Sequence, residues 1–222
     1  MIRQIRLGIS NVFLLKGDRP ILVDSGRPRD AQVIAEALRR EQVALADLAL
    51  ILHTHGHWDH CGSTRQLTEW SKAPTAIHRA DADQLARGVN GPLRPTCLSA
   101  RLLKPFLNWA YPGVTADILL EDETDLAPFG IAGRVISTPG HTAGSVTILT
   151  ATGAIVGDLL MGGYLGGKLF PRVPNLHYFA EDRVALRASI RKVLHLAPAQ
   201  IYVGHGGPLD LGAIEPQWVD TV

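Results

Sequence analysis

Cysteine is scarce in this chain, and its scarcity limits how the fold can be held together. Only Cys61 and Cys97 occur among 222 residues, so the sequence predicts no disulfide framework. Long apolar runs are also missing, because none approaches the about 20 residues that a bilayer-spanning helix needs. Residues 1–6 contain no apolar stretch of signal-peptide length. We therefore expect a soluble, cytoplasmic protein without a membrane partner.

The chain has no excess of charge of either sign. Its formal net charge is +1, and acidic and basic residues are interspersed. A nucleic-acid-binding face is strongly basic, so we predict no nucleic-acid partner. With 46% apolar residues, the chain is long enough to bury a sizeable core. We predict a single domain over residues 1–222 that acts on a small-molecule substrate, and the sequence leaves the oligomeric state open.

Hydrophobic patterning predicts alternating strands and helices. Apolar runs at 12–16 and 21–24 flank a turn and predict a hairpin. Further strands are predicted over 48–52, 75–77, 117–120, 131–137, 145–150, 154–156 and 200–203, and helices over 30–41, 59–73, 80–87 and 181–196. This order fits no doubly wound parallel sheet. It fits an α/β fold in which two mixed β-sheets pack face to face with helices outside.

Two segments interrupt this pattern. Residues 88–115 place glycines and prolines between apolar pieces, which predicts an irregular, partly helical insertion. The insertion is interpreted either as a lid or dimer surface, or as ordinary packing beneath a long loop. Residues 162–178 are rich in glycine and proline and predict a loop near the functional site.

The run His-Thr-His-Gly-His-Trp-Asp-His at 53–60 is the strongest functional signal. It places four ligand-type side chains within six residues, namely His55, His57, Asp59 and His60. Imidazole and carboxylate groups favour zinc and similar first-row ions. The alternatives are a solvated histidine-rich turn or an expression artefact, but the run is internal and interrupted by other residue types. The run therefore predicts a metal site at the end of the strand that precedes it.

Three more ligand-type residues have a similar local context. His141, Asp158 and His205 each come after a predicted strand and directly after a glycine, which permits a sharp turn and a close approach of the backbone. Alone, each histidine would be an ordinary residue at the rim of a sheet and Asp158 a turn or helix cap. With the first cluster they make seven candidate ligands, more than one catalytic zinc takes. Seven ligands suit two metals that share a carboxylate and a bridging hydroxide.

The other histidines carry weaker signals. His53, His78, His177 and His195 are left out of the candidate set, although His177 lies in the glycine-rich segment and could reach the pocket. Tyr164 follows Asp158 closely and is predicted to donate a hydrogen bond to a developing oxyanion. The aromatic residues Trp58, Trp109 and Tyr178 are interpreted either as walls of an apolar pocket or as core.

Five short motifs occur in a fixed order along nearly the whole chain. They are Leu-Val-Asp-Ser-Gly at 22–26, Thr-His-Gly-His-Trp-Asp-His at 54–60, Thr-Pro-Gly-His-Thr at 138–142, Gly157-Asp158 and Gly204-His205. Together they resemble the motifs of the metallo-β-lactamase-fold hydrolases. The resemblance implies an αββα four-layer sandwich with the metals at one edge of the sheets.

The resemblance also implies roles for individual residues. His55, His57 and His141 would hold one metal, and Asp59, His60 and His205 the other. Asp158 would bridge the two ions. Asp59 would also orient the bridging hydroxide, which makes it a catalytic residue. Asp24 would support the ligand turn from behind, unless it is a plain β-turn residue.

Departures from particular members narrow the implied activity. The commonest zinc β-lactamases have a cysteine where Asp158 stands, and the di-iron oxidoreductases have a glutamate where His57 stands. The full set is similar to glyoxalase II, the lactone hydrolases and the RNA-processing members. The RNA-processing members usually add a large domain or a basic exosite, and neither is visible. Only residues 206–222 follow His205, so the glutathione-binding helical domain of glyoxalase II is not expected, which puts glutathione specificity in doubt.

These observations predict a dinuclear metal-dependent hydrolase. Two divalent ions, zinc first with iron or manganese as alternatives, would generate a hydroxide that attacks a thioester, lactone or related ester carbonyl. Cys61 is interpreted as a small buried residue rather than a nucleophile. The alternatives are an iron-dependent, persulfide-type oxidoreductase of the same fold and a non-catalytic metal-binding module.

Overall fold

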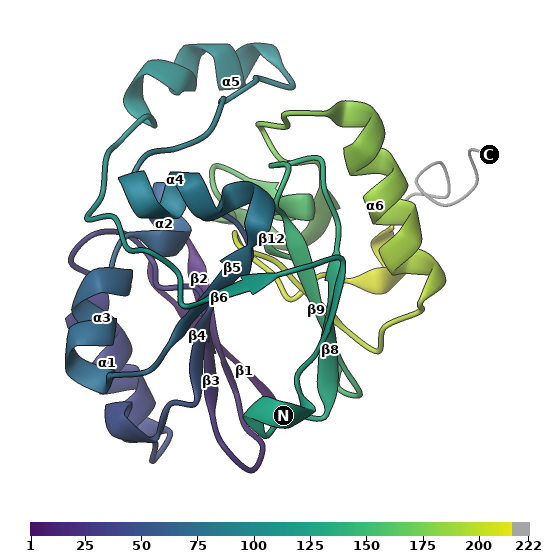
Figure 1. Ribbon diagram of the computed structural model, residues 1–222. Helices are drawn as coiled ribbons and strands as arrows, with labels where there is room; N and C mark the ends of the chain where they lie inside the picture. Colours follow the sequence, from purple (N-terminus) through teal and green to yellow (C-terminus); the bar gives the residue numbers. More distant parts are fainter. Residues whose placement is uncertain (215–222) are drawn as a thin grey trace.

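Two β-sheets packed face to face form the centre of the molecule, and helices cover the outer face of each (Figure 1). A computed structural model describes residues 1–214. The predicted αββα sandwich of two mixed sheets is confirmed. The predicted single domain ran to residue 222, and residues 215–222 lie outside the described part of the chain.

The first sheet contains six strands in sequence order. They are β1 (Ile2–Arg6), β2 (Asn11–Leu15), β3 (Ile21–Val23), β4 (Leu50–Leu52), β5 (Thr75–His78) and β6 (Ile118–Leu120). The first three strands are antiparallel, so β2 and β3 form the predicted hairpin. From β3 to β6 the pairing is parallel, which brings the C-terminal ends of these strands to one edge of the sheet. The turn after β4 carries the first histidine cluster to this edge.

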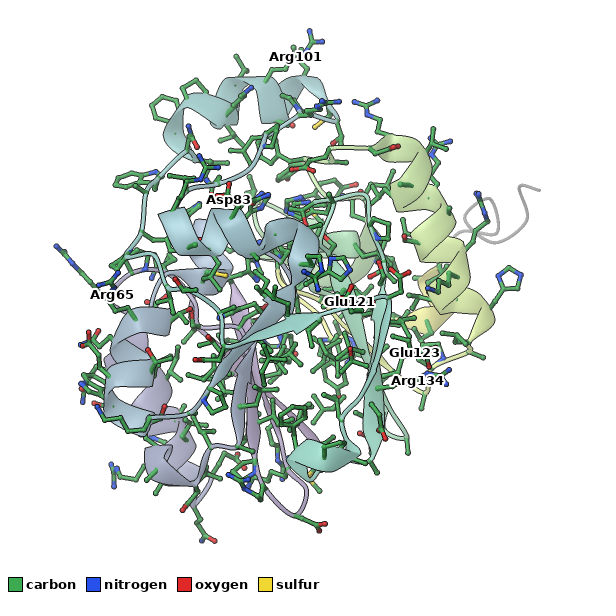
Figure 2. All side chains as sticks on the ribbon, in the orientation of Figure 1. Arg65, Asp83, Arg101, Glu121, Glu123 and Arg134 are labelled. Carbon is green, nitrogen blue, oxygen red and sulfur yellow. The ribbon has the colours of Figure 1, made fainter. Side chains whose placement is uncertain are left out.

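The second sheet contains five strands in the order β13-β10-β9-β8-β7. They are β7 (Glu123–Asp125), β8 (Gly133–Ser137), β9 (Val146–Thr150), β10 (Gly153–Ile155) and β13 (Ile201–Tyr202). The pairing is antiparallel except between β10 and β13. Glu123 and Arg134 face each other across β7 and β8, with Oε1 and Nη1 3.5 Å apart, and both side chains lie at the surface (Figure 2).

Helices cover both outer faces. The helices of the chain are α1 (Ala31–Arg40), α2 (Trp58–Cys61), α3 (Thr64–Ser71), α4 (Ala82–Arg87), α5 (Leu98–Leu103) and α6 (Arg183–His195), and short 3-10 turns include η2 (Arg79–Asp81), η3 (Lys104–Phe106) and η5 (Gly157–Leu159). In Figure 1, α1 and α3 lie on the left of the sheets and α6 on the right, and α5 lies apart from the sheets at the top of the view. Within residues 1–214, each helix is too short or too polar to cross a bilayer.

Strand alternation divides the core into layers. Phe13 and Leu15 of β2 point into the space between the sheets, whereas Val12 and Leu14 pack against α1 and α3. The helix α6 packs on the other face of the second sheet through Leu186, Ile190 and Val193. Each such buried aliphatic side chain contributes about 1.5–3 kcal/mol. Both sheets are therefore fixed from two sides, which makes their edges rigid supports for the loops.

Two predicted elements differ from the structure. The helix predicted over 59–73 is divided into α2 and α3 at Gly62 and Ser63. A Cβ atom on Gly62 would lie 2.3 Å from the Pro28 nitrogen. The two backbone segments therefore pass so closely that only glycine fits at position 62.

The segment 162–178, predicted to be a loop, is mostly a hairpin. The strands β11 (Met161–Tyr164) and β12 (Leu169–Asn175) pair antiparallel. Pro171 and Pro174 weaken the strand signal in the sequence, but a two-stranded ribbon tolerates residues that cannot donate a hydrogen bond. The insertion at 88–115 is irregular and partly helical, as predicted, because it contains α5 and η3.

Candidate metal centre

All seven predicted ligand side chains meet at one edge of the two sheets. His55, His57, Asp59 and His60 come from the turn after β4 and from α2. The other three, His141, Asp158 and His205, follow β8, β10 and β13. Six of the seven residues are buried, and Asp59 is partly exposed. Segments about 150 residues apart in sequence thus contribute to a single cluster.

Asp158 lies at the centre of this cluster. Its Oδ2 atom is 3.2 Å from Nε2 of His205, 3.6 Å from Nε2 of His141 and 3.8 Å from Nε2 of His55. Its Oδ1 atom is 3.5 Å from Nε2 of His60. The two carboxylate oxygens therefore face histidines from both predicted ligand sets.

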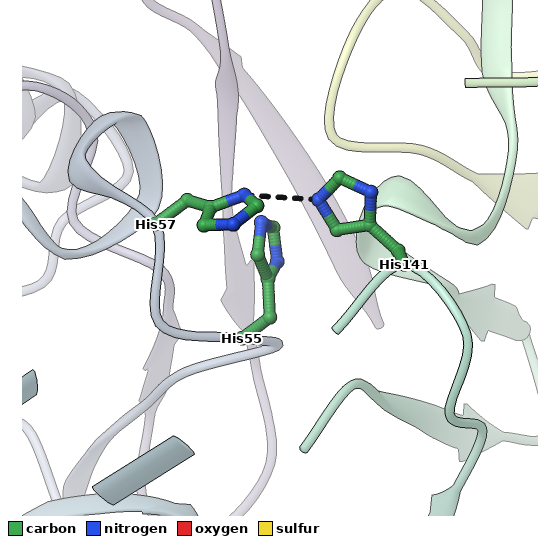
Figure 3. A group of neighbouring side chains, drawn as sticks. All are labelled: His55, His57 and His141. Carbon is green, nitrogen blue, oxygen red and sulfur yellow. Dashed lines mark hydrogen bonds between the residues drawn. The ribbon is translucent and has the colours of Figure 1, made fainter. Parts of the chain in front are cut away.

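Three imidazoles form the first set. Nδ1 of His57 lies 3.0 Å from Nε2 of His141, and the ring of His55 stands below them with its centroid 4.8 Å and 4.7 Å from theirs (Figure 3). One potential ligand atom from each of the three lies within 4.8 Å of the others. This spacing is compact enough for a single ion to contact all three.

The second set has a carboxylate and two imidazoles. Oδ2 of Asp59 lies 3.5 Å from Nε2 of His205 and 4.0 Å from Nε2 of His60. These three atoms also lie within 4.8 Å of one another.

Several of these atoms have no hydrogen-bond partner in the described residues. They are Nε2 of His55, His57 and His60, and Oδ1 of Asp158. A buried polar atom without a partner costs about 1–3 kcal/mol, so four in one place call for an explanation. Divalent metal ions provide one, since neutral imidazole and carboxylate are their usual ligands. The donor set therefore fits bound metal.

In four of the five histidines, all except His57, the second ring nitrogen contacts a group outside the cluster. Such contacts fix the ring and direct the other nitrogen toward a metal. The Nδ1 partners are Thr54 Oγ1 for His55 at 3.0 Å, Asp24 Oδ2 for His60 at 2.9 Å, the Phe179 carbonyl for His141 at 2.9 Å and the Ile9 carbonyl for His205 at 2.8 Å.

Gly204 shows why a glycine precedes a ligand. A Cβ atom at this position would lie 2.1 Å from Oδ1 of Asp158 and 2.7 Å from Cε1 of His60. Only a residue without a side chain lets the strand end approach the carboxylate so closely.

Burial and the neighbouring charges lower the pKa of some histidines in the cluster and raise the pKa of others. Desolvation lowers the pKa of His57 and of His141 to about 3, and lowers the pKa of His55 well below its ordinary value. Burial also disfavours charge on His205 and on His60, but the neighbouring carboxylates together outweigh it. Asp158 and Asp59 raise the pKa of His205 to about 9. Asp158, Asp24 and Asp59 raise the pKa of His60 well above its ordinary value. A metal that binds His60 and His205 therefore displaces protons, which makes its affinity pH-dependent.

Asp24 is buried and holds the ligand turn. Its carboxylate accepts hydrogen bonds from the Thr54 N–H at 2.8 Å and from the Thr54 hydroxyl, and Oδ2 faces Nδ1 of His60. This position agrees with the supporting role that the family resemblance implies.

We expect Asp24→Ala to weaken metal binding by about 10–100-fold, because His60 loses the group that orients it. Chelator competition would measure the change. Asp18→Ala, at an exposed loop position, is the control and should bind metal like the parent. Equal affinities for the parent and Asp24→Ala would disprove the supporting role.

Asp81 is a further buried carboxylate beside the site, and no local sequence pattern predicts its role. It accepts hydrogen bonds from the Gly56 N–H at 2.9 Å, the Thr142 hydroxyl at 2.7 Å and the Gly144 N–H at 2.8 Å. Asp81 thereby joins the turn that carries His57 to the loop that carries His141. In sequence it resembles an ordinary residue at a helix start.

A cavity of about 420 Å³ opens above the cluster. His57, Asp59, Asp158 and His205 line it on the metal-centre side. Its walls are largely apolar and include Trp58, Leu93, Leu103, Leu107, Tyr178 and Phe179. Trp109 does not line the cavity but stacks on Trp58, with ring centroids 6.1 Å apart.

The structure places Tyr164 away from the cavity and His177 at it, as the sequence allowed for His177. Tyr164, predicted to be an oxyanion donor, lies on β11 with 51% of its surface exposed and is not among the residues that line the cavity. His177, which the candidate set left out, lines the cavity and lies 3.2 Å from Asp158.

Comparison with known proteins identifies relatives over most of the chain. The profile of the metallo-beta-lactamase superfamily matches residues 5–205. A probable metallo-hydrolase of Methanocaldococcus jannaschii is 29% identical over 201 residues, which cover 89% of this chain and 87% of that protein. A hydroxyacylglutathione hydrolase of Shewanella sp. (strain ANA-3) is 30% identical over 168 residues, or 74% of this chain but only 52% of that protein.

A solved structure shows the same fold. The crystal structure of the BLEG-1 B3 metallo-beta-lactamase superposes with a TM-score of 0.68 at 26% identity, and the match covers 96% of this chain and 95% of that one. The prediction of a metal-dependent hydrolase is confirmed, and the chain belongs to the metallo-beta-lactamase superfamily.

Proposed function

We propose that the chain is a dinuclear metal-dependent hydrolase that cleaves a thioester, a lactone or a related ester. The observation that supports it best is the cluster of buried, unpartnered nitrogen and oxygen atoms around Asp158. Divalent ions held by these residues would supply a hydroxide nucleophile at neutral pH and would polarise the carbonyl group.

The residues divide between two ions. We assign His55, His57 and His141 to the first ion. Asp59, His60 and His205 are assigned to the second, with Asp158 between the two. The compact spacing of each set and the two-sided placement of Asp158 support this assignment. Zinc suits the mixture of imidazole and carboxylate, and iron or manganese are the alternatives.

Asp59 is the residue that we assign to proton transfer. Its carboxylate lines the cavity and lies beside His205, so it can contact both the centre and a bound substrate. There it can orient the attacking water and hold the proton that the water loses. Tyr164 could assist only if the β11–β12 hairpin turned its hydroxyl toward the cavity.

The apolar walls favour a substrate with an apolar acyl group. Each methylene that becomes buried contributes about 0.8 kcal/mol, or about a four-fold gain in kcat/KM. We therefore expect kcat/KM to rise by about this factor per methylene along a series of p-nitrophenyl acyl esters, until the chain fills the cavity.

Paired variants of α5 test the same wall. Leu103→Asp places a charge on the cavity wall. We expect this variant to lose the rise of kcat/KM with acyl chain length. Leu98→Asp, on the same helix but 72% exposed and away from the cavity, should leave it unchanged. A flat series in the parent, or preference for a hydroxyacylglutathione over every apolar ester, would disprove the apolar acyl assignment.

A panel of carbonyl substrates, assayed with the zinc, manganese and iron forms, tests the activity itself. Hydrolysis by at least one metal form supports the proposal. A single iron per chain with oxidation of a persulfide, and no hydrolysis, would instead identify an oxidoreductase. Bound metal without any turnover would identify a metal-binding module.

A further inference from the structure

We propose that His177 is an additional ligand of the metal centre, which binds from the cavity side through Nε2, beside His141 and Asp158. This inference rests on the proposed metal site and adds one residue to it. It concerns a histidine outside all five motifs, in the segment between β12 and α6.

The position of the ring carries the inference. Nε2 of His177 lies 3.2 Å from Oδ2 of Asp158, as close as Nε2 of His205 does. The ring centroid is 4.5 Å from that of His141, and the two rings are nearly perpendicular, at 89°. His141, Asp158 and His177 each offer a ligand atom within 4.8 Å of the others, the same spacing as in the two assigned sets.

His177 is also held like the assigned ligands. Its Nδ1 lies 3.2 Å from the Phe179 carbonyl, which is the group that faces Nδ1 of His141 at 2.9 Å. A carbonyl oxygen has two lone pairs and can accept from both rings. When Nδ1–H donates to this carbonyl, the lone pair of Nε2 faces the centre and is free for a metal.

The other tautomer gives His177 a different role. The Phe179 N–H also lies 3.2 Å from Nδ1, and if it donates there the proton sits on Nε2. His177 would then donate a hydrogen bond to Asp158 and would act only through that carboxylate. The two tautomers can be separated experimentally, because only the first brings nitrogen into contact with the ion.

The insertion fixes this histidine in place. The Thr96 hydroxyl donates to the His177 carbonyl at 2.9 Å, and the Thr96 N–H donates to the Tyr178 carbonyl at 2.8 Å. Pro95 forms a bridge with Phe179 on the same stretch. His177 itself is only 8% exposed. Residues 95–96 thus hold the segment against the centre, so the ring needs no rearrangement to reach an ion.

Cobalt substitution tests the ligand role without an activity assay. We expect His177→Gln to change the visible absorption of the cobalt protein and to weaken the binding of one ion by at least about ten-fold in chelator competition. His195→Gln, at an exposed histidine at the end of α6, is the control and should match the parent in both.

His177→Cys provides a positive signal, because a thiolate is a strong ligand for such ions. We expect this variant to gain a thiolate-to-cobalt charge-transfer band that the parent lacks. An unchanged spectrum and affinity in His177→Gln, with no new band in His177→Cys, would overturn the proposal. Weaker binding with an unchanged spectrum would also overturn it, in favour of the hydrogen bond to Asp158. A parent that binds no cobalt would instead disprove the metal site on which the inference rests.

Discussion

Asp59→Asn is expected to lower kcat for ester hydrolysis by about 10²–10⁴-fold, the usual contribution of a positioned general base. The amide keeps the size of the side chain but cannot accept the proton, and it is a poorer metal ligand. Because Asp59 is the partly exposed member of the cluster, the substitution should leave the fold intact. Steady-state kinetics on the best substrate of the panel would measure the loss, with metal content determined on the same sample.

Asp83→Asn is the matched control for this variant. Asp83 lies on α4 at the surface, where it pairs with Arg87 (Figure 2). Exposed pairs of this kind contribute little, so its kcat should equal that of the parent. If Asp59→Asn kept more than a tenth of the parental kcat, Asp59 would not be the proton acceptor.

Removal of the metal is expected to have the second large effect. At a free metal concentration about 1,000 times its dissociation constant, one bound ion stabilises the folded state by about 4 kcal/mol. For a chain of this length, loss of one ion corresponds to a fall in Tm of about 8–16 °C, so chelation of both ions should lower the Tm by at least this amount. Activity should disappear with the metal, because the buried nitrogens alone offer no nucleophile.

Scanning calorimetry of chelated and reloaded protein would measure this change. Restoration of both Tm and activity by zinc, but not by magnesium, is the expected pattern, since imidazole ligands suit zinc and not magnesium. Activity that survives complete chelation would show that hydrolysis does not need the ions.

Much of the fold and of the candidate metal centre could be predicted from local sequence. The ligands His141, Asp158 and His205 could be found because each follows a short apolar strand and a glycine. Gly204 shows the physical reason, since a side chain there would collide with Asp158. The strands β8, β10 and β13 run in the same direction, so their ends lie at one edge of the sheet. This is why distant residues could be grouped before their positions were known.

The missed features depend on contacts that no local pattern records. The β11–β12 hairpin contains Pro171 and Pro174 and has few strand-forming residues. It can be recognised only from the pairing between its two strands, which includes a bulge. Asp81 resembles a helix-start residue, yet its partners are donors on two other loops. His177 follows no strand–glycine motif, and its place at the centre depends on contacts with Thr96, about 80 residues earlier in the sequence.

We propose that two ions bind within this one cluster of side chains. Anomalous diffraction from crystals of the zinc-loaded protein, measured on both sides of the zinc absorption edge, tests it most directly. We expect two peaks per chain, about 3.5–4 Å apart, on either side of the Asp158 carboxylate. A single peak, or peaks away from Asp158, would contradict it.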